Sequence, residues 1–143
     1  MNEKKVLVSG CFDLLHGGHI ALFKTAASFG KLYVSVGSDE NLMQLKGKKP
    51  YFSQEERLYI VKSVRYVYDA FVATGSGLID FEPDMKRIQP DIFIVNNDGH
   101  TSYKKRPCKE LRIQYVVLDC IPEPELPGCD YFRKRRRVYN CRF

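Results

Sequence analysis

The chain has 143 residues, enough for one domain whose core needs no metal or disulfide to hold it together. Its 44% hydrophobic and 28% charged residues exclude a disordered chain, and no uncharged apolar run approaches the ~20 residues of a membrane span. A formal charge of +6 favours an anionic partner, and no secretory leader opens the chain, so we expect a cytoplasmic protein.

Strand and helix patterns alternate along the first half of the chain. Short apolar runs predict strands, helical spacing of apolar residues predicts helices, and a capping box at Ser53 and Glu56 marks the start of the second helix. The expected elements are a strand at Lys5–Ser9, a helix at Gly18–Phe29, a strand at Leu32–Val36 and a helix from Ser53 to about Val64.

The alternation continues in the second half. We expect a strand at Ala70–Ala73, a helix at Ile79–Ile88, a strand at Asp91–Val95, a short helix near Lys104–Leu111 and a strand at Tyr115–Leu118. Pro83 must lie in the first turn of its helix or delay its start. This order predicts an α/β fold with a five-stranded parallel sheet, strand order 3-2-1-4-5 and helices on both faces.

The loop after the first strand, Gly10–His19, carries several features of a phosphate site. Its glycines let a ligand approach the backbone, and the following helix start offers unpaired N–H groups to an anion. His16 and His19 are three positions apart and can donate to phosphoryl oxygens. The loop matches neither the dinucleotide fingerprint nor the Walker loop. A zinc site at Cys11, His16 and His19 and a purely structural turn are the alternatives.

The five cysteines do not form a recognisable framework. Their number is odd and none forms a Cys-x-x-Cys pair, which argues against disulfides and against a zinc site. Free thiols in a reducing compartment are the simplest interpretation.

The same loop resembles a known signature. Gly10–His19 fits the Gly-x-Phe-Asp-x-x-His-x-Gly-His pattern of the cytidylyltransferase-like nucleotidyltransferase superfamily. Small members of it act on glycerol 3-phosphate or heptose 1-phosphate. The resemblance covers about residues 4–121 and continues in Val36–Glu40, Lys46–Pro50, Glu55–Arg57, Ser63–Val67 and Gln89–Asp98. It implies a Rossmann-like fold and transfer of a nucleoside monophosphate to a phosphorylated small molecule, with release of pyrophosphate.

The resemblance also implies roles for individual residues. The catalytic residues would be His16, His19 and Lys46, and the acceptor would be held by Lys46 and Arg65. The nucleotide would be bound by Gly10, Cys11, Phe12, Gly18, Lys48 and Asp98. We expect Mg²⁺ on the phosphates, with no ligand assigned from the sequence, and no organic cofactor. Asp13 is expected to brace the loop.

The substrates are only partly specified. The segments Lys46–Lys49 and Arg65–Val67 favour CTP with a glycerol-phosphate type of acceptor. ATP, with heptose phosphate or flavin mononucleotide as acceptor, is the alternative, and so is a nucleotide-binding domain with impaired transfer. Relatives with this motif are commonly dimers, so a homodimer is expected. Nucleic acid is not expected as the main partner, because no recognised motif accompanies the basic run Arg133–Arg137.

The C-terminal segment departs from the family pattern. We assign 1–128 to the nucleotidyltransferase domain and 129–143 to an atypical basic segment that forms its last helix or tail. The family has a Ser/Thr-rich stretch here, whereas Leu126–Arg133 contains neither residue and is followed by the basic run Arg133–Arg137. Three interpretations stay open: arginines replace the hydroxyls, transfer is impaired, or the C-terminus is altered.

Overall fold

The computed structural model describes residues 3–96 and 101–118. Its elements are β1 (Lys5–Gly10), α1 (Gly17–Ala27), β2 (Lys31–Val36), α2 (Asp39–Lys46), α3 (Gln54–Lys62), β3 (Asp69–Val72), the 3-10 helix η1 (Gly77–Ile79), α4 (Glu82–Ile88), β4 (Ile92–Asn96), α5 (Ser102–Glu110) and β5 (Gln114–Leu118). The boundary expected at residue 128 lies outside the described residues. Across the described ranges, no helix combines the length and apolar character needed to cross a bilayer.

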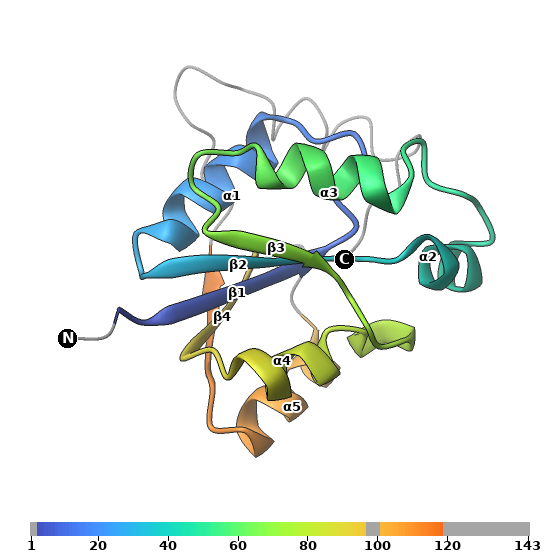
Figure 1. The fold of residues 1–143 in the computed structure, drawn as a ribbon. Coiled ribbons are helices and arrows are strands. Elements are labelled where there is room, and N and C mark those ends of the chain that lie inside the picture. The colour runs from blue at the N-terminus through green and yellow to red at the C-terminus, as the bar shows by residue number, and fades with distance from the viewer. Residues whose placement is uncertain (1–2, 97–100, 119–143) are drawn as a thin grey trace.

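The five strands form one parallel sheet in the order β3-β2-β1-β4-β5, which confirms the predicted fold. Helices α1 and α3 cover one face, and α4 and α5 cover the other (Figure 1). Helix α2 lies beyond the carboxyl ends of the strands rather than on a face (Figure 1). The central strand β1 therefore delivers the loop that follows it to the middle of the carboxyl edge, where ligands bind in folds of this type.

Two apolar cores, one on each face, hold this edge in place. Side chains of β1 alternate between them: Val6 and Val8 pack on the side of Phe23, and Leu7 packs on the side of Phe93. Each of these side chains is 0–1% exposed. Burying one such side chain contributes about 1.5–3 kcal/mol, so the sheet is a rigid base for the loops.

Helix α2 is the main element that apolar spacing did not predict. It has eight residues, most of them polar, and only Asn41 and Leu42 are buried. Local capping sets its bounds: the Ser38 hydroxyl accepts from the Asn41 amide, and Gly47 ends the helix at a φ of 68°. A helix defined by its caps carries too little apolar periodicity to be recognised from the sequence.

The predicted helix over Ile79–Ile88 is in fact two pieces. The chain first forms η1, and α4 starts only at Glu82 with Pro83 in its first turn, one of the two options that the proline left open. Ser53 caps α3 as predicted, because its hydroxyl accepts from the Glu56 amide at 3.2 Å.

Candidate functional site

The loop after β1 has a strained backbone. Phe12 and Leu14 have φ values of 50° and 53°, in the left-handed region that non-glycine residues seldom occupy. Each such residue costs about 1–3 kcal/mol, and the cost must be offset by its surroundings. The Phe12 ring, which is 5% exposed, meets the rings of Phe23 at 5.1 Å and His19 at 5.6 Å between centroids. Aromatic packing thus fixes the loop and places His19.

This packing leads to a prediction about Gly10. A Cβ atom at Gly10 would lie 2.9 Å from the Phe12 ring, whereas one at Gly37 would come no closer than 3.4 Å to a side chain. We expect Gly10→Ala to lower the free energy of unfolding by about 1–3 kcal/mol, because the ring must shift. Urea unfolding measures the loss, with Gly37→Ala as the matched control. Equal losses in the two variants would contradict this account of the loop.

The two histidines form a pair at the start of α1. His16 is the N-cap, and its Nδ1 accepts from the Gly18 amide at 3.0 Å. The His16 amide in turn donates to Nδ1 of His19 at 3.1 Å, and the ring centroids are 3.9 Å apart. A neutral imidazole whose Nδ1 accepts must carry its proton on Nε2. A neutral ring at either position therefore carries its proton on Nε2, beside the positive end of a helix.

The environment keeps His19 neutral. Burial, and secondly the neighbouring His16, lower the pKa of His19 from 6.5 to about 3. Protonation would also oppose the bond that its Nδ1 accepts. At neutral pH this ring is a hydrogen-bond donor and not a cation.

The lowered pKa predicts a pH dependence of stability. Below pH 6.5 His19 binds a proton in the unfolded chain, whereas in the folded protein it stays unprotonated until about pH 3. The free energy of unfolding should therefore fall as the pH drops through this window. We expect the wild type to lose stability relative to His19→Gln between pH 7.5 and pH 5, as measured by urea unfolding. Asp80, whose pKa is raised to about 6, makes the free energy of unfolding rise as the pH falls. Because Asp80 is present in both proteins, its effect cancels in the comparison. A difference in the free energy of unfolding between the two proteins that stays constant over this pH range would contradict the lowered pKa of His19.

Lys46 lies next to the loop after β1. It is the last residue of α2, and its Nζ is 3.9 Å from Sγ of the buried Cys11. The segment after it is held by Asp13, whose carboxylate accepts from the amides of Tyr51 at 2.7 Å and Phe52 at 3.1 Å. This confirms the bracing role expected for Asp13. Lys48, in the same segment, is exposed.

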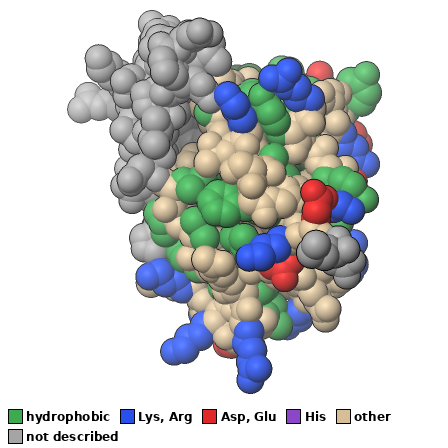
Figure 2. All heavy atoms as spheres, turned by 90° about the vertical axis from the view of Figure 1, so that its left-hand side faces the viewer, with side chains coloured by type: hydrophobic (Ala, Val, Ile, Leu, Met, Phe, Trp, Pro, Cys, Tyr) green, Lys and Arg blue, Asp and Glu red, His purple; other side chains and the backbone are tan. Residues whose placement is uncertain are grey.

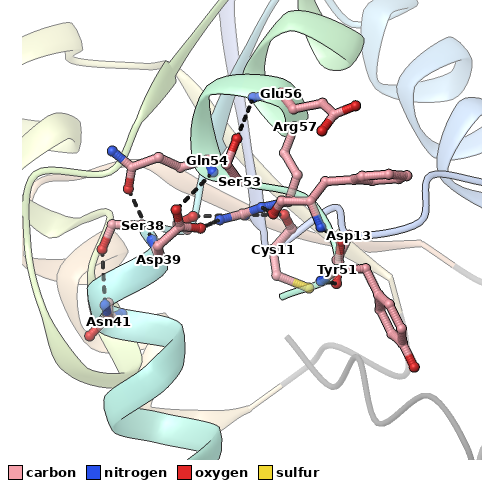
Figure 3. Close-up of polar contacts among 12 residues, drawn as sticks. Cys11, Asp13, Ser38, Asp39, Asn41, Tyr51, Ser53, Gln54, Glu56 and Arg57 are labelled. Atoms are coloured by element: carbon pink, nitrogen blue, oxygen red, sulfur yellow. Dashed lines mark hydrogen bonds and ion pairs between the residues drawn. The ribbon is translucent and has the colours of Figure 1, made fainter. Parts of the chain in front are cut away.

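Arg57 ties together the loops that surround the site (Figure 3). Its fully buried guanidinium donates to the carbonyls of Cys11 at 2.7 Å and Gly37 at 2.8 Å, and to the Asp39 carboxylate at 2.7 Å. Its Nε donates to the Phe52 carbonyl at 3.0 Å. One side chain thus joins the loop after β1, the loop after β2, the start of α2 and the segment that follows α2.

The starts of α2 and α3 are joined by a second, reciprocal contact. The Asp39 amide donates to Oε1 of Gln54 at 2.9 Å, and the Gln54 amide donates to Asp39 at 3.1 Å (Figure 3). Asp39 therefore bonds to Arg57 and Gln54 at once. This arrangement fixes α2, and with it Lys46, relative to α3.

The structure does not bring every predicted residue to this place. Arg65 lies between α3 and β3, near Tyr68, whose amide bonds to Leu32 at the start of β2. It is therefore at the amino edge of the sheet, where its guanidinium donates to the Tyr66 hydroxyl. Figure 2, which views that edge, shows Lys and Arg side chains around a hydrophobic centre and no histidine on the described part of the face. Within one copy of the chain, Arg65 is far from the histidines.

The remaining residues predicted to bind the nucleotide lie in the loop after β1 and at the start of α1, except for one. Asp98 lies outside the described residues. The Gly18 amide already donates to His16, so Gly18 offers a phosphate close access rather than its own N–H. Gly10 ends β1, and the buried Cys11 and Phe12 follow it directly.

Four polar residues at this edge were missed as site residues. They share deep or partial burial beside the loop after β1: Asn41, Arg57, Asp80 and Lys104. Arg57 and Lys104 belong to runs of charged residues, which normally indicate a solvated surface. The signal that was available for Arg57 is its place within the family-like Glu55–Arg57 segment.

The described residues do not build a protein cage for a metal ion. Residues 3–96 and 101–118 contain no group of three or more His, Cys, Asp and Glu side chains able to hold one. The imidazole Nδ1 atoms at the loop already accept from amides, which disfavours the zinc alternative.

Known proteins resemble this chain in sequence and in fold. The cytidylyltransferase-like family model matches residues 7–127. FAD synthase of Thermococcus kodakarensis is 36% identical over 135 residues, covering 91% of this chain and 89% of the relative. Glycerol-3-phosphate cytidylyltransferase of Staphylococcus aureus is 31% identical over 113 residues, covering 78% and 84%. Among solved structures, a lipopolysaccharide core biosynthesis protein of Thermoplasma volcanium has a TM-score of 0.68 at 25% identity, covering 82% of this chain and 96% of that one. The chain belongs to the cytidylyltransferase-like family and is a nucleotidyltransferase.

Proposed function

We propose that this chain transfers a nucleoside monophosphate from a nucleoside triphosphate to the phosphate of a small hydroxylated acceptor. The observation that carries the proposal is the histidine pair: two Nε2–H donors, fixed through their Nδ1 atoms, at a helix start beside Lys46. This arrangement suits an anion whose charge changes during the reaction.

The reaction is a single displacement. An oxygen of the acceptor phosphate attacks the α-phosphorus, a new P–O bond forms, and the bond from the α-phosphorus to the bridging oxygen breaks. Pyrophosphate leaves with the electron pair of that bond. The two substrates together carry about six negative charges, so the barrier lies mainly in their repulsion and in their alignment. No side-chain nucleophile is required.

Each protein group has a part in this scheme. The amides around Gly10–Phe12 hold the nucleotide phosphates, together with Lys48, and Gly18 lets a phosphate approach the start of α1 closely. His16 and His19 donate to the α-phosphate and to the bridging oxygen, where charge grows as the bond breaks. Lys46, beside Cys11, faces the acceptor phosphate. Arg65 has no part in this scheme within one copy of the chain, since it lies at the opposite edge.

Mg²⁺ is proposed as the companion of the triphosphate. When bound, it neutralises phosphate charge while keeping several of its own waters, so it needs few protein ligands. The described residues offer no cage for it, and none of the steps above is assigned to it. The scheme needs no organic cofactor.

For the substrates we propose CTP and a glycerol-phosphate type of acceptor first, because of the Lys46–Lys49 segment and the match to the Staphylococcus aureus enzyme. A specific observation favours a second candidate, ATP with flavin mononucleotide. It is the 36% identity to the Thermococcus kodakarensis FAD synthase across 91% of this chain.

The test is pyrophosphate release by the full chain with Mg²⁺, for CTP and ATP each combined with glycerol 3-phosphate, flavin mononucleotide and heptose 1-phosphate. We expect one combination to exceed the others clearly. Thermal shift with each nucleotide should show stabilisation, about 2.7 kcal/mol at 100 times Kd. Absence of both transfer and nucleotide binding would refute the proposal. Nucleotide binding without transfer would support the alternative of a nucleotide-binding domain with impaired transfer. Light scattering of the same sample tests the predicted homodimer.

A further inference from the structure

We propose that the hollow between α2, η1 and the loop after β1 binds the hydroxyl-bearing carbon chain of the acceptor, through Asp80 and Lys104, with Asn41 holding Asp80 in place. This inference rests on the proposed function and goes beyond it, because it assigns recognition of the acceptor's polyol part to residues with no role so far. A polyol phosphate is the ligand class.

The hollow adjoins the reaction site directly. It is lined by Ser9, Gly10 and Cys11 at the end of β1 and by parts of α2, η1 and α5. Its enclosed part has room for about one water-sized group, such as a single hydroxyl, and the rest of the hollow is open to solvent. Because Cys11 lies 3.9 Å from Nζ of Lys46, a ligand in the hollow has its phosphate end within reach of the group proposed to hold that phosphate.

The polar lining is rigidly held. The Asn41 carboxamide accepts from the Gly77 amide at 2.7 Å and donates to the Gly77 carbonyl at 3.1 Å. Its Nδ2 also lies 3.3 Å from Oδ2 of Asp80. Asn41 is 3% exposed, so its position is set by the fold rather than by solvent. The contact with Asn41 therefore fixes the position of the Asp80 carboxylate in the lining of the hollow.

The charges in the hollow suit hydroxyl groups. Lys104 reaches in from α5 and is only 3% exposed, an unusual burial for an ammonium group. Burial raises the pKa of Asp80 to about 6, although Asn41 and Lys104 both oppose that rise. A carboxylate that accepts and an ammonium that donates can together bind vicinal hydroxyls, while the two N–H groups of Asn41 are taken by Gly77 and Asp80.

The rest of the wall is apolar. Leu42, Leu45, Leu78 and Phe81 line the hollow beside the polar groups. A polyol has the matching character, since carbon atoms face one side of its chain and hydroxyls the other. Glycerol 3-phosphate, the ribityl phosphate of flavin mononucleotide and a sugar phosphate all share this chemistry.

The test uses Asp80→Asn and Lys104→Met in the full chain. The Asp80→Asn substitution keeps a side-chain oxygen that can accept from Asn41, so the wall is preserved while the charge is lost. We expect the KM for the acceptor to rise tenfold or more, whereas the Kd for the nucleotide, measured by thermal shift, changes less than twofold. Lys105→Met, a neutralised neighbour on the same helix, is the matched control and should leave both values unchanged. Running glycerol 3-phosphate, flavin mononucleotide and a sugar phosphate separately identifies which polyol is bound.

The outcomes separate this inference from the proposed function. If the wild type transfers to no acceptor, the proposed function fails. If the wild type transfers and both folded variants keep the acceptor's KM, the inference is overturned while the function stands. Equal weakening of nucleotide and acceptor would also overturn it. Should Asp80→Asn fail to fold, Lys104→Met decides by the same measurements.

Discussion

His16→Asn and His19→Asn are expected to lower turnover by 10² or more while changing the Kd of the nucleotide by only a few-fold. In asparagine the Oδ1 atom occupies the place of Nδ1 and can still accept the backbone amide that each histidine accepts. The Nε2–H donor is lost. A donor aimed at charge that develops in the transition state is typically worth about 3–4 kcal/mol, whereas ground-state binding is shared with the amides of the loop after β1 and with lysines.

The glutamine variants are the matched controls. In glutamine the side-chain amide reaches the place of Nε2 and can donate there, but nothing replaces Nδ1. We expect His16→Gln and His19→Gln to retain more activity than the asparagine variants, although the capping bond of His16 is lost and stability falls by about 1 kcal/mol. Single-turnover rates and thermal-shift Kd values separate the two effects. Parallel losses of binding and turnover would make the histidines ground-state ligands only.

Arg57→Ala should destabilise the fold by about 3 kcal/mol or more. The substitution leaves the Asp39 carboxylate and the carbonyls of Cys11, Gly37 and Phe52 without the cation that binds them. Breaking a buried charge network by removing one partner typically costs about 3–5 kcal/mol. The melting temperature should drop by about 10 °C, and activity should fall further than stability explains because Lys46 loses its fixed position.

The control is Arg106→Ala. Arg106 on α5 pairs with Glu82 and Glu110 at 3.7 Å and 3.6 Å, and its side chain is 57% exposed. Exposed pairs contribute about 0–1 kcal/mol, so this variant should melt close to the wild type. A second variant, Asp39→Asn, keeps the carbonyl contacts of Arg57 and should lose less stability than Arg57→Ala. Similar melting temperatures for Arg57→Ala and Arg106→Ala would contradict the central place given to Arg57.

The sheet and its order could be predicted from the sequence because apolar runs at regular intervals reflect burial directly. The same reasoning missed α2, whose bounds depend on the Ser38 cap and the Gly47 turn rather than on periodicity. Lys104 stands in a basic run that by itself indicates a solvated surface, whereas tertiary packing buries its side chain. Charged residues in a run look alike in a sequence, and only the fold decides which one turns inward.

The candidate site could be recognised in the sequence where one continuous segment supplies it. Gly10–His19 carries the glycines, the histidines and the helix start together, and local hydrogen bonds complete it. Arg65 shows the limit of such reasoning. A motif places a residue along the chain, but the edge of the sheet at which it lies depends on where α3 ends and β3 begins. The role of Arg57 could not be predicted from its own segment either, because its four acceptors come from segments up to 46 positions away.

The stereochemical course of transfer tests the central claim most directly. That claim is a single displacement at the α-phosphorus by the acceptor, with no bond to the protein. The full chain would be given the α-thio analogue of the accepted nucleotide, of known configuration at phosphorus, together with its acceptor. We predict a product with inverted configuration. Retention would require two displacements through a covalent intermediate on the protein, for which Cys11 beside Lys46 would be the first residue to examine, and would contradict the account.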